Sequence, residues 1–253
     1  MNAKVMRKGV ARRAADHYRG SGPTAYYFAR TKLRLDPFYP LLLADGLVPA
    51  GARILDLGCA QGLLAAWLFA AQQCYSEGAW DSACPAPVSV ESYRGIDCNE
   101  SEIRRARRAM GHRAEFVVGD IARERLSTAT LIVLLDVLHY LDYAAQKQLL
   151  RLIRAALPAE GVLLLRIGDS AGGMPARMSG WIDRLVLRVR GGKGELYRRP
   201  LTEWLVLLNE IGFTVQEVAH QRSPGYANAL LRAFPAPPLA AAGIPSNAPG
   251  GRT

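Results

Sequence analysis

From residue 52 onward, short apolar runs alternate with helical patterns, and this alternation constrains the fold more than any other feature. The candidate strands lie at 53–58, 92–97, 114–120, 130–136, 161–168, 213–220 and 228–234. The candidate helices between them lie at 62–73, 100–110, 144–157 and 201–211. The central strands are apolar throughout, as strands covered on both faces must be. The pattern predicts an α/β protein built on a largely parallel sheet.

The length of 253 residues, half of them apolar, predicts one domain with appendages. We expect a helical, aromatic-rich cover over residues 1–48, the main domain over 49–234, and a disordered Pro/Gly-rich tail over 235–253. Two insertions interrupt the regular alternation, at 74–91 and 169–199.

Composition limits the cellular location, the cysteine chemistry and the binding partners that we expect. No apolar run reaches the roughly 18 residues of a membrane span, so we expect a cytoplasmic protein, with an organellar transit peptide as the alternative for the basic N-terminus. The four cysteines lack CxxC pairs and nearby histidines, which indicates neither a zinc site nor a disulfide framework: Cys59, Cys74, Cys84 and Cys98. The net charge of +10 favours an anionic partner, whether nucleic acid, a membrane surface, or an acidic substrate or carrier.

The segment "ILDLGCAQG" (54–62) joins a buried strand to a helix through two glycines, Gly58 and Gly62. Such a turn lets a ligand approach the main chain, and the helix that follows offers unpaired N–H groups to an anionic group. Dinucleotide enzymes usually carry G-x-G-x-x-G, which differs from the pattern here. A nucleotide-like ligand is therefore predicted, and a nicotinamide cofactor is the weaker alternative.

"LDLGCAQG" resembles the first motif of the class I S-adenosylmethionine-dependent methyltransferases, with Ala60 at the place of the usual middle glycine. "YRGIDCNE", "FVVGDIAR" and "IVLLDVLHYL" resemble further landmarks of that family in the expected order, so the resemblance covers about residues 50–234. It implies S-adenosyl-L-methionine as cofactor and no metal. The implied fold is a Rossmann-like, doubly wound, seven-stranded sheet, mostly parallel with an antiparallel last strand.

The resemblance also implies a cofactor site. Asp97 would accept hydrogen bonds from both ribose hydroxyls, Asp120 would meet the adenine amino group, and Ile121 would pack on the adenine ring. The implied cofactor-binding set is Asp56, Gly58, Ala60, Gly62, Asp97, Cys98, Asp120, Ile121, Asp136 and Val137. An acid at a strand end is by itself more often a turn or cap residue, but four landmarks in order favour the ligand role. Cys59 and Cys98 are interpreted as small packing residues rather than nucleophiles.

Methyl transfer from a sulfonium is an in-line displacement, so the protein mainly aligns the reacting atoms. His139 follows the fourth motif and is the candidate base, because its unperturbed pKa is about 6.5. The alternative is a half-buried residue that caps the next helix. The residues predicted to line the acceptor pocket are Tyr18, Tyr26, Tyr27 and Tyr140, although aromatic residues at helical spacing are more often core.

The fourth motif reads "DVLH" and lacks the Asp- or Asn-Pro-Pro-aromatic sequence of enzymes that methylate base amines. A small-molecule acceptor, free or carrier-bound, is therefore predicted for O- or C-methylation. The arrangement is also similar to methyltransferases of bacterial secondary metabolism, such as polyketide or aryl-polyene-type pigment pathways. The alternatives are an RNA methyltransferase, favoured by the charge, and an inactive cofactor-binding partner subunit.

The insertion at 169–199 ends in "WIDRLVLRVRGGKGELYRR", which predicts a basic amphipathic helix. Such a helix can cover the acceptor site, lie on a membrane surface, or receive an acidic carrier. We expect its apolar side to pack on the domain as a lid, with the arginines solvated.

Overall fold

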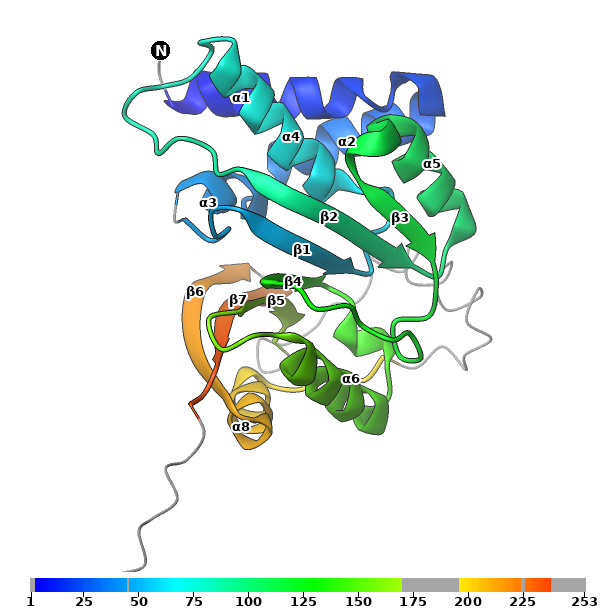
Figure 1. Ribbon diagram of the computed structural model, residues 1–253, viewed down its shortest axis with the longest axis vertical. Helices are drawn as coiled ribbons and strands as arrows, with labels where there is room; N and C mark the ends of the chain where they lie inside the picture. The colour runs from blue at the N-terminus through cyan, green and yellow to red at the C-terminus, as the bar shows by residue number, and fades with distance from the viewer. Residues whose placement is uncertain (1–2, 45, 170–195, 224–225, 238–253) are drawn as a thin grey trace, which may run out of the picture.

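The computed structural model describes residues 3–44, 46–169, 196–223 and 226–237. Seven strands form one sheet in the order β3-β2-β1-β4-β5-β7-β6 (Figure 1). The strands are β1 (Ala52–Leu57), β2 (Val90–Asp97), β3 (Glu115–Val118), β4 (Leu131–Leu135), β5 (Val162–Gly168), β6 (Phe213–Ser223) and β7 (Tyr226–Pro235). The first five pair in parallel, and β7 runs antiparallel between β5 and β6. This confirms the predicted seven-stranded, mostly parallel sheet with an antiparallel last strand.

Helices cover both faces of the sheet, which explains why the central strands are apolar throughout. On one face lie α4 (Leu63–Ser76) and α5 (Glu100–Met110), and on the other lie α6 (Tyr143–Ala156) and α8 (Leu201–Ile211) (Figure 1). Alternate side chains of β1 divide between two buried clusters: Ile54 faces the α4 side, whereas Leu55 and Leu57 face the α6 side. The core is therefore split by the sheet into two layers.

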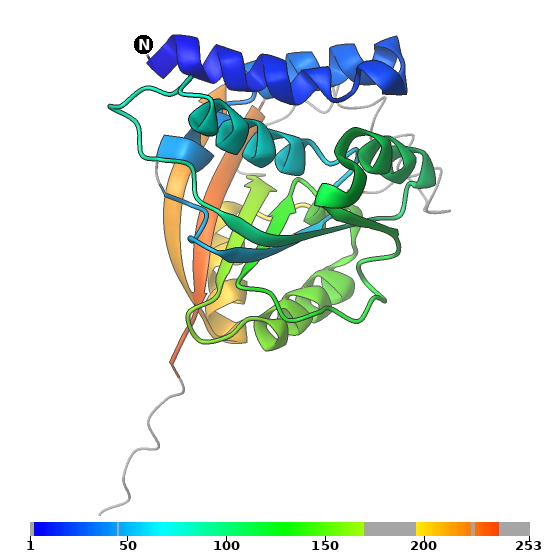
Figure 2. The same ribbon diagram turned by 45° about the horizontal axis from the view of Figure 1, so that its top comes forward.

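The N-terminal cover consists of α1 (Ala3–Asp16), the short 3₁₀ helix η1 (Arg19–Ser21), α2 (Pro23–Leu35) and α3 (Phe38–Ala44). Figure 2 shows α1 and α2 as a layer outside α4. Ala25, Ala29 and Leu33 recur every four residues on the buried side of α2, the spacing of one helical face. Helices therefore make up most of residues 3–44.

Local capping explains where two helices of the core begin. Asn99 caps α5, because its side chain accepts hydrogen bonds from the amides of Ser101 and Glu102. Asp142 caps α6 by accepting from Ala145. Because β1 to β4 run parallel, their carboxyl ends lie along one edge of the sheet.

Several expected boundaries shift. The third strand ends at Val118, two residues before Asp120, and the insertion predicted at 74–91 begins inside α4, which continues to Ser76. Segment 119–130, between β3 and β4, contains turns but no helix. The predicted lid helix and most of the predicted tail lie outside the described residues. Among the helices of the described residues, none combines the length and the apolar composition that a membrane span requires.

Candidate functional site

The turn after β1 requires its two glycines for conformation and for packing. Gly58 and Gly62 have φ of 78° and 77°, in the left-handed region that favours glycine. A Cβ at Gly58 would lie 2.4 Å from Cγ2 of Val137, and one at Gly62 would lie 2.8 Å from the ring of Phe116. The side chains of β3 and of the segment after β4 therefore press directly against this turn.

Ala60 replaces the usual middle glycine without leaving the left-handed region, because its φ is 47°. Its amide donates a 3.0 Å hydrogen bond to Oδ2 of Asp97, and the amide of Asn99 donates a 2.8 Å bond to Oδ1. Each carboxylate oxygen of Asp97 accepts two hydrogen bonds at most, so both retain acceptor capacity. Asp97 is only half-buried, which leaves that capacity accessible.

Asp56 lies beneath the turn rather than on its surface. Its carboxylate is 4% exposed and accepts a short hydrogen bond from the hydroxyl of Tyr93, whose ring packs 5.9 Å from that of Phe116. Burial raises the pKa of Asp56 to about 7, although the Tyr93 hydrogen bond opposes the rise. Asp56 thus fixes Tyr93 beneath the turn, and its contact with a cofactor stays a prediction.

The second and third landmarks differ in exposure. Cys98 is half-buried beside Asp97, whereas Asp120 is exposed and Ile121 is 1% exposed. Oδ1 of Asp120 accepts a 3.0 Å hydrogen bond from the amide of Ala122, and Oδ2 lies 3.7 Å from Nε of Arg123. The carboxylate of Asp120 therefore shapes its own turn and remains open to solvent.

Asp136 follows β4 with φ of 57°, an unusual value for a residue with a side chain. Its carboxylate pairs with the guanidinium of Arg166 from β5, and a 3.0 Å bond joins Nε of Arg166 to Oδ1. Val137, next in the chain, is buried against Gly58. Arg166 was not predicted from the sequence, although a charged residue inside the apolar run "VLLLRIG" was a signal for it.

His139 lies in the 3₁₀ helix η3 (Leu138–Tyr140) and is half-buried. Its ring centroid lies 4.1 Å from that of Tyr140, and its carbonyl accepts a 2.9 Å hydrogen bond from the amide of Tyr197. The N-cap of α6 is Asp142, so the alternative in which His139 caps this helix is wrong. Its role as a base stays a prediction.

The aromatic residues of the cover occupy different environments. Tyr18 has no exposed surface, and its hydroxyl donates a 2.8 Å hydrogen bond to the carbonyl of Gln61 in the turn. We therefore place Tyr18 in the core beneath the turn, and its predicted pocket role finds no support here. Tyr26 is half-buried and Tyr27 is 63% exposed, with ring centroids 5.3 Å apart.

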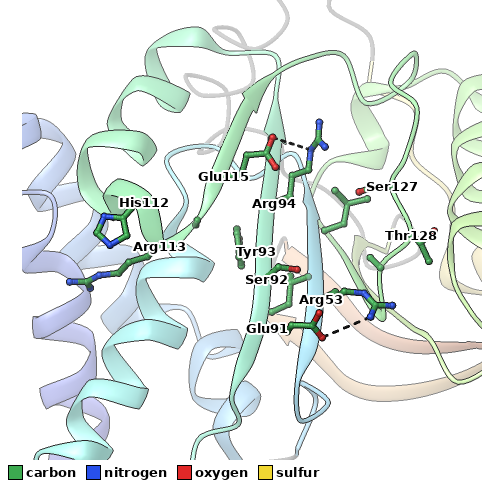
Figure 3. Close-up of a pocket in the computed structure, with 14 residues that line it drawn as sticks. Arg53, Glu91, Ser92, Tyr93, Arg94, His112, Arg113, Glu115, Ser127 and Thr128 are labelled. Atoms are coloured by element: carbon green, nitrogen blue, oxygen red, sulfur yellow. Dashed lines mark ion pairs between the residues drawn. The ribbon is translucent and has the colours of Figure 1, made fainter.

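A groove of about 490 Å³ lies toward the amino ends of β1 to β3, and of the site residues described above only Tyr93 lines it (Figure 3). Two ion pairs lie along it, with N–O distances of 3.9 Å for Arg53–Glu91 and 3.8 Å for Arg94–Glu115. Ser127 and Thr128, from the helix-free segment before β4, also line it. Ligands of doubly wound sheets bind at the carboxyl ends of the strands, so we do not assign the cofactor to this groove.

The carboxyl edge fits an adenosyl cofactor with an amino-acid part. Asp97 offers free acceptor capacity for hydroxyl groups, and Gly62, the N-cap of α4, provides no side-chain cap. The first amides of α4 can therefore serve an anionic group. Within the described residues, no group of three His, Cys, Asp or Glu side chains is placed to hold a metal ion.

Known proteins share both the sequence pattern and the fold. Residues 27–218 match the family described as "Methyltransferase domain". No curated protein matches the chain significantly.

Three solved structures illustrate the fold. The pyocyanin biosynthetic protein PhzM is 22% identical with a TM-score of 0.53; the match covers 87% of this chain and 61% of PhzM, so the chain spans about three fifths of that protein. Magnesium protoporphyrin IX methyltransferase (ChlM) from Synechocystis PCC 6803, with bound SAH, is 17% identical with a TM-score of 0.53, over 92% of this chain and 99% of that one. An O-methyltransferase family protein from Burkholderia thailandensis is 19% identical with a TM-score of 0.53, over 87% and 63%. The chain therefore belongs to the methyltransferase-domain family, as its four landmarks predicted, and has the fold of S-adenosylmethionine-dependent methyltransferases.

Proposed function

We propose that the protein transfers a methyl group from S-adenosyl-L-methionine to a small-molecule acceptor, by O- or C-methylation. The observation that carries this proposal is the carboxylate of Asp97, held by the amides of Ala60 and Asn99 at the end of β2. It fixes an acceptor group for vicinal hydroxyls beside a left-handed glycine turn and the uncapped start of α4. That combination is suited to a ribose and an amino-acid carboxylate together.

The bound cofactor would supply a methyl group already activated on a sulfonium. The residues that would hold it are Gly58, Ala60 and Gly62 in the turn, with Asp97, Cys98, Asp120, Ile121, Asp136 and Val137 at the following strand ends. These residues bind and orient the reactants, and alignment is the main contribution that this edge makes to the rate. His139, on η3 beside Asp136 and Val137, is the candidate to remove a proton from the acceptor.

The acceptor class is also a proposal. PhzM is described as a pyocyanin biosynthetic protein and ChlM as a magnesium protoporphyrin IX methyltransferase, which supports an aromatic or conjugated small molecule. Tyr26 and Tyr27 on α2 and Tyr140 on η3 offer aromatic surface for such an acceptor. A role in bacterial secondary metabolism follows from this proposal, and polyketide or aryl-polyene-type pigments are the first acceptors to try, free or on a carrier.

Calorimetry with S-adenosylhomocysteine tests the cofactor assignment directly. We expect saturable binding, with thermal stabilisation by S-adenosylmethionine but not by NADH at equal concentration. Stabilisation by NADH alone would favour an oxidoreductase. Tight S-adenosylhomocysteine binding without turnover over a broad acceptor panel would favour an inactive partner subunit.

RNA is the second candidate acceptor, because positive charge is concentrated in the cover. Residues 1–35 contain nine Lys and Arg against one Asp, which gives a net charge of +8 of the total +10. We expect no specific RNA binding at about 0.15 M salt, where nonspecific phosphate contacts weaken. Sub-micromolar retention of structured RNA at that salt would overturn the small-molecule assignment.

A further inference from the structure

A buried charge cluster joins the N-terminal cover to the carboxyl edge of the sheet. The guanidinium of Arg166, on β5, lies between two carboxylates from distant parts of the chain. Nη1 donates to both oxygens of Asp36 at 2.8 Å, and Nε and Nη2 donate to the two oxygens of Asp136. Asp36 lies between α2 and α3, and Asp136 directly follows β4. Three separate elements therefore meet through one side chain.

The cluster is desolvated and balanced in charge. The side chains of Arg166 and Asp36 are 9% and 8% exposed, and Asp136 is 32% exposed. Burial would raise the pKa of Asp36, but Arg166 and Lys32 outweigh it and hold the pKa below its ordinary value. Nζ of Lys32 lies 2.9 Å from Oδ2 of Asp36. The two basic and two acidic side chains of the cluster therefore have a net charge of zero. Removing one partner from such a cluster leaves a buried charge without compensation, which strongly destabilises the folded protein.

The cluster also reaches the glycine turn. Asp136 is bound to Arg166 twice, because its amide donates a 3.0 Å hydrogen bond to the Arg166 carbonyl in addition to the side-chain pair. Its φ of 57° persists only where surrounding contacts hold it. The next residue, Val137, packs against Gly58. A continuous set of contacts thus runs from the cover, through Arg166, to the turn.

We propose that Arg166 is a positioning residue that ties the α2–α3 junction of the cover to the end of β4, so that the glycine turn and the cover order together. The identity of the ligand at the turn rests on the proposed function, whereas the tie itself does not. Coupling of this kind is reciprocal, so a ligand that orders the turn also orders the cover. The acceptor side of the site is then completed only when the cofactor side is filled.

Hydrogen exchange of the full-length protein tests the tie without any ligand. Asp36→Asn should raise exchange about tenfold or more in residues 23–44 and, by a smaller factor, in residues 57–63 and 136–141, because the tie couples the two regions. Asp136→Asn should raise exchange most in residues 57–63 and 136–141 and by a smaller factor in residues 23–44, because Arg166 stays paired with Asp36. Arg166→Met should raise exchange in both regions. Lys147→Met is the control, because it breaks an exposed 3.1 Å ion pair with Glu210 that lies elsewhere.

Arg166→Lys keeps the positive charge but loses the planar guanidinium that reaches both carboxylates. It replaces Arg166→Met in the experiment if that variant fails to fold. It should raise exchange in residues 23–44 and 136–141 by a smaller factor. Exchange in these two regions within threefold of wild type in every variant would overturn the proposal. A uniform rise over the whole chain in every variant, which is general destabilisation, would overturn it equally.

Adding S-adenosylhomocysteine separates this inference from the proposed function. In the wild type it should protect both residues 57–63 and residues 23–44, whereas in Arg166→Lys it should protect residues 57–63 alone. Protection of both regions in the variant would contradict the coupling. Failure of the compound to bind the wild type would contradict the cofactor assignment, while the ligand-free exchange pattern would still decide the tie.

Discussion

The amide of Ala60 donates a 3.0 Å hydrogen bond to Oδ2 of Asp97, so one carboxylate joins the turn after β1 to the end of β2. The other oxygen, Oδ1, accepts from the amide of Asn99, which caps α5. Asp97 is therefore oriented before any ligand arrives. Such preorganisation reduces the entropy that binding must overcome.

Asp97→Ala should weaken S-adenosylhomocysteine binding by about 1.5 to 3 kcal/mol, roughly ten- to a hundredfold. The change would remove the two charge-assisted hydrogen bonds that we propose between Asp97 and the ribose, and it also releases the Ala60 amide. Calorimetry measures the dissociation constant, and Asp16→Asn, an exposed carboxylate on the cover, is the control. An unchanged constant in Asp97→Ala would show that the second motif has been placed wrongly.

Gly58→Ala should lower the free energy of unfolding by about 2 to 4 kcal/mol, because a left-handed φ and a steric conflict with Val137 add together. Gly78→Ala is a matched control, since Gly78 has φ of 72° but no atom within 4 Å of its added Cβ. It should cost only about 1 to 2 kcal/mol. Urea denaturation measures both.

Combining Gly58→Ala with Val137→Ala should recover part of the loss, because the smaller side chain makes room for the added methyl group. Strictly additive effects would mean that the two residues do not press on each other.

The sequence predicted the sheet, the four core helices and the glycine turn. Strands buried on both faces of the sheet are apolar throughout, and helices that pack on the sheet carry apolar residues at helical spacing, so both can be recognised along the chain. It did not predict the cluster around Arg166, because Arg166 pairs with Asp136 across 30 residues of chain and with Asp36 across 130. Two local signals existed: an arginine inside an apolar strand, and an aspartate before proline in "LDPF". Each identifies a residue in need of a partner, but neither identifies the partner.

The buried hydrogen bond between Tyr93 and Asp56 was missed for the same reason. The resemblance assigns Asp56 to the cofactor-binding set, and that role stays a prediction; strand alternation turns its side chain toward Tyr93 and the α4 layer. Adjacency along the chain did not indicate which face of the sheet the carboxylate occupies.

Asp56 should make stability depend on pH in the direction opposite to that of a salt-bridged acid. Its pKa is about 7 in the folded protein and about 3.9 when unfolded, so the folded state holds more protons between these values. Stability contributed by this group therefore falls as pH rises from about 4 to 7 and is constant above. Burial causes the shift, and ionisation of Asp56 is the unfavourable step.

Asp56→Asn removes this titration while keeping an oxygen that can accept from Tyr93. The stability of the variant relative to wild type should rise between pH 4 and 8, by up to the order of 4 kcal/mol. Urea denaturation at several pH values measures the difference. A difference that stays constant over this range would contradict the raised pKa.

His139→Ala tests whether this residue performs chemistry. The variant keeps the main-chain carbonyl that accepts from Tyr197, and α6 keeps its cap at Asp142, so little stability should be lost. If His139 removes a proton from the acceptor, kcat should fall about a hundredfold or more, with S-adenosylhomocysteine affinity nearly unchanged. The rise of the wild-type rate through a pKa near neutrality should disappear as well.

Asp142→Ala is the matched control, because it removes the α6 cap at a cost of about 0.5 to 2 kcal/mol without touching the ring of His139. It should lower thermal stability and leave the pH profile of the rate intact. His139→Ala should instead change the pH profile of the rate and leave thermal stability nearly unchanged. The turnover number and the pH profile of both variants are measured with an acceptor identified by screening the broad acceptor panel. A His139→Ala turnover number within threefold of wild type would remove His139 from the mechanism. The rate would then depend on alignment at the carboxyl edge, because the sulfonium methyl group needs no further activation.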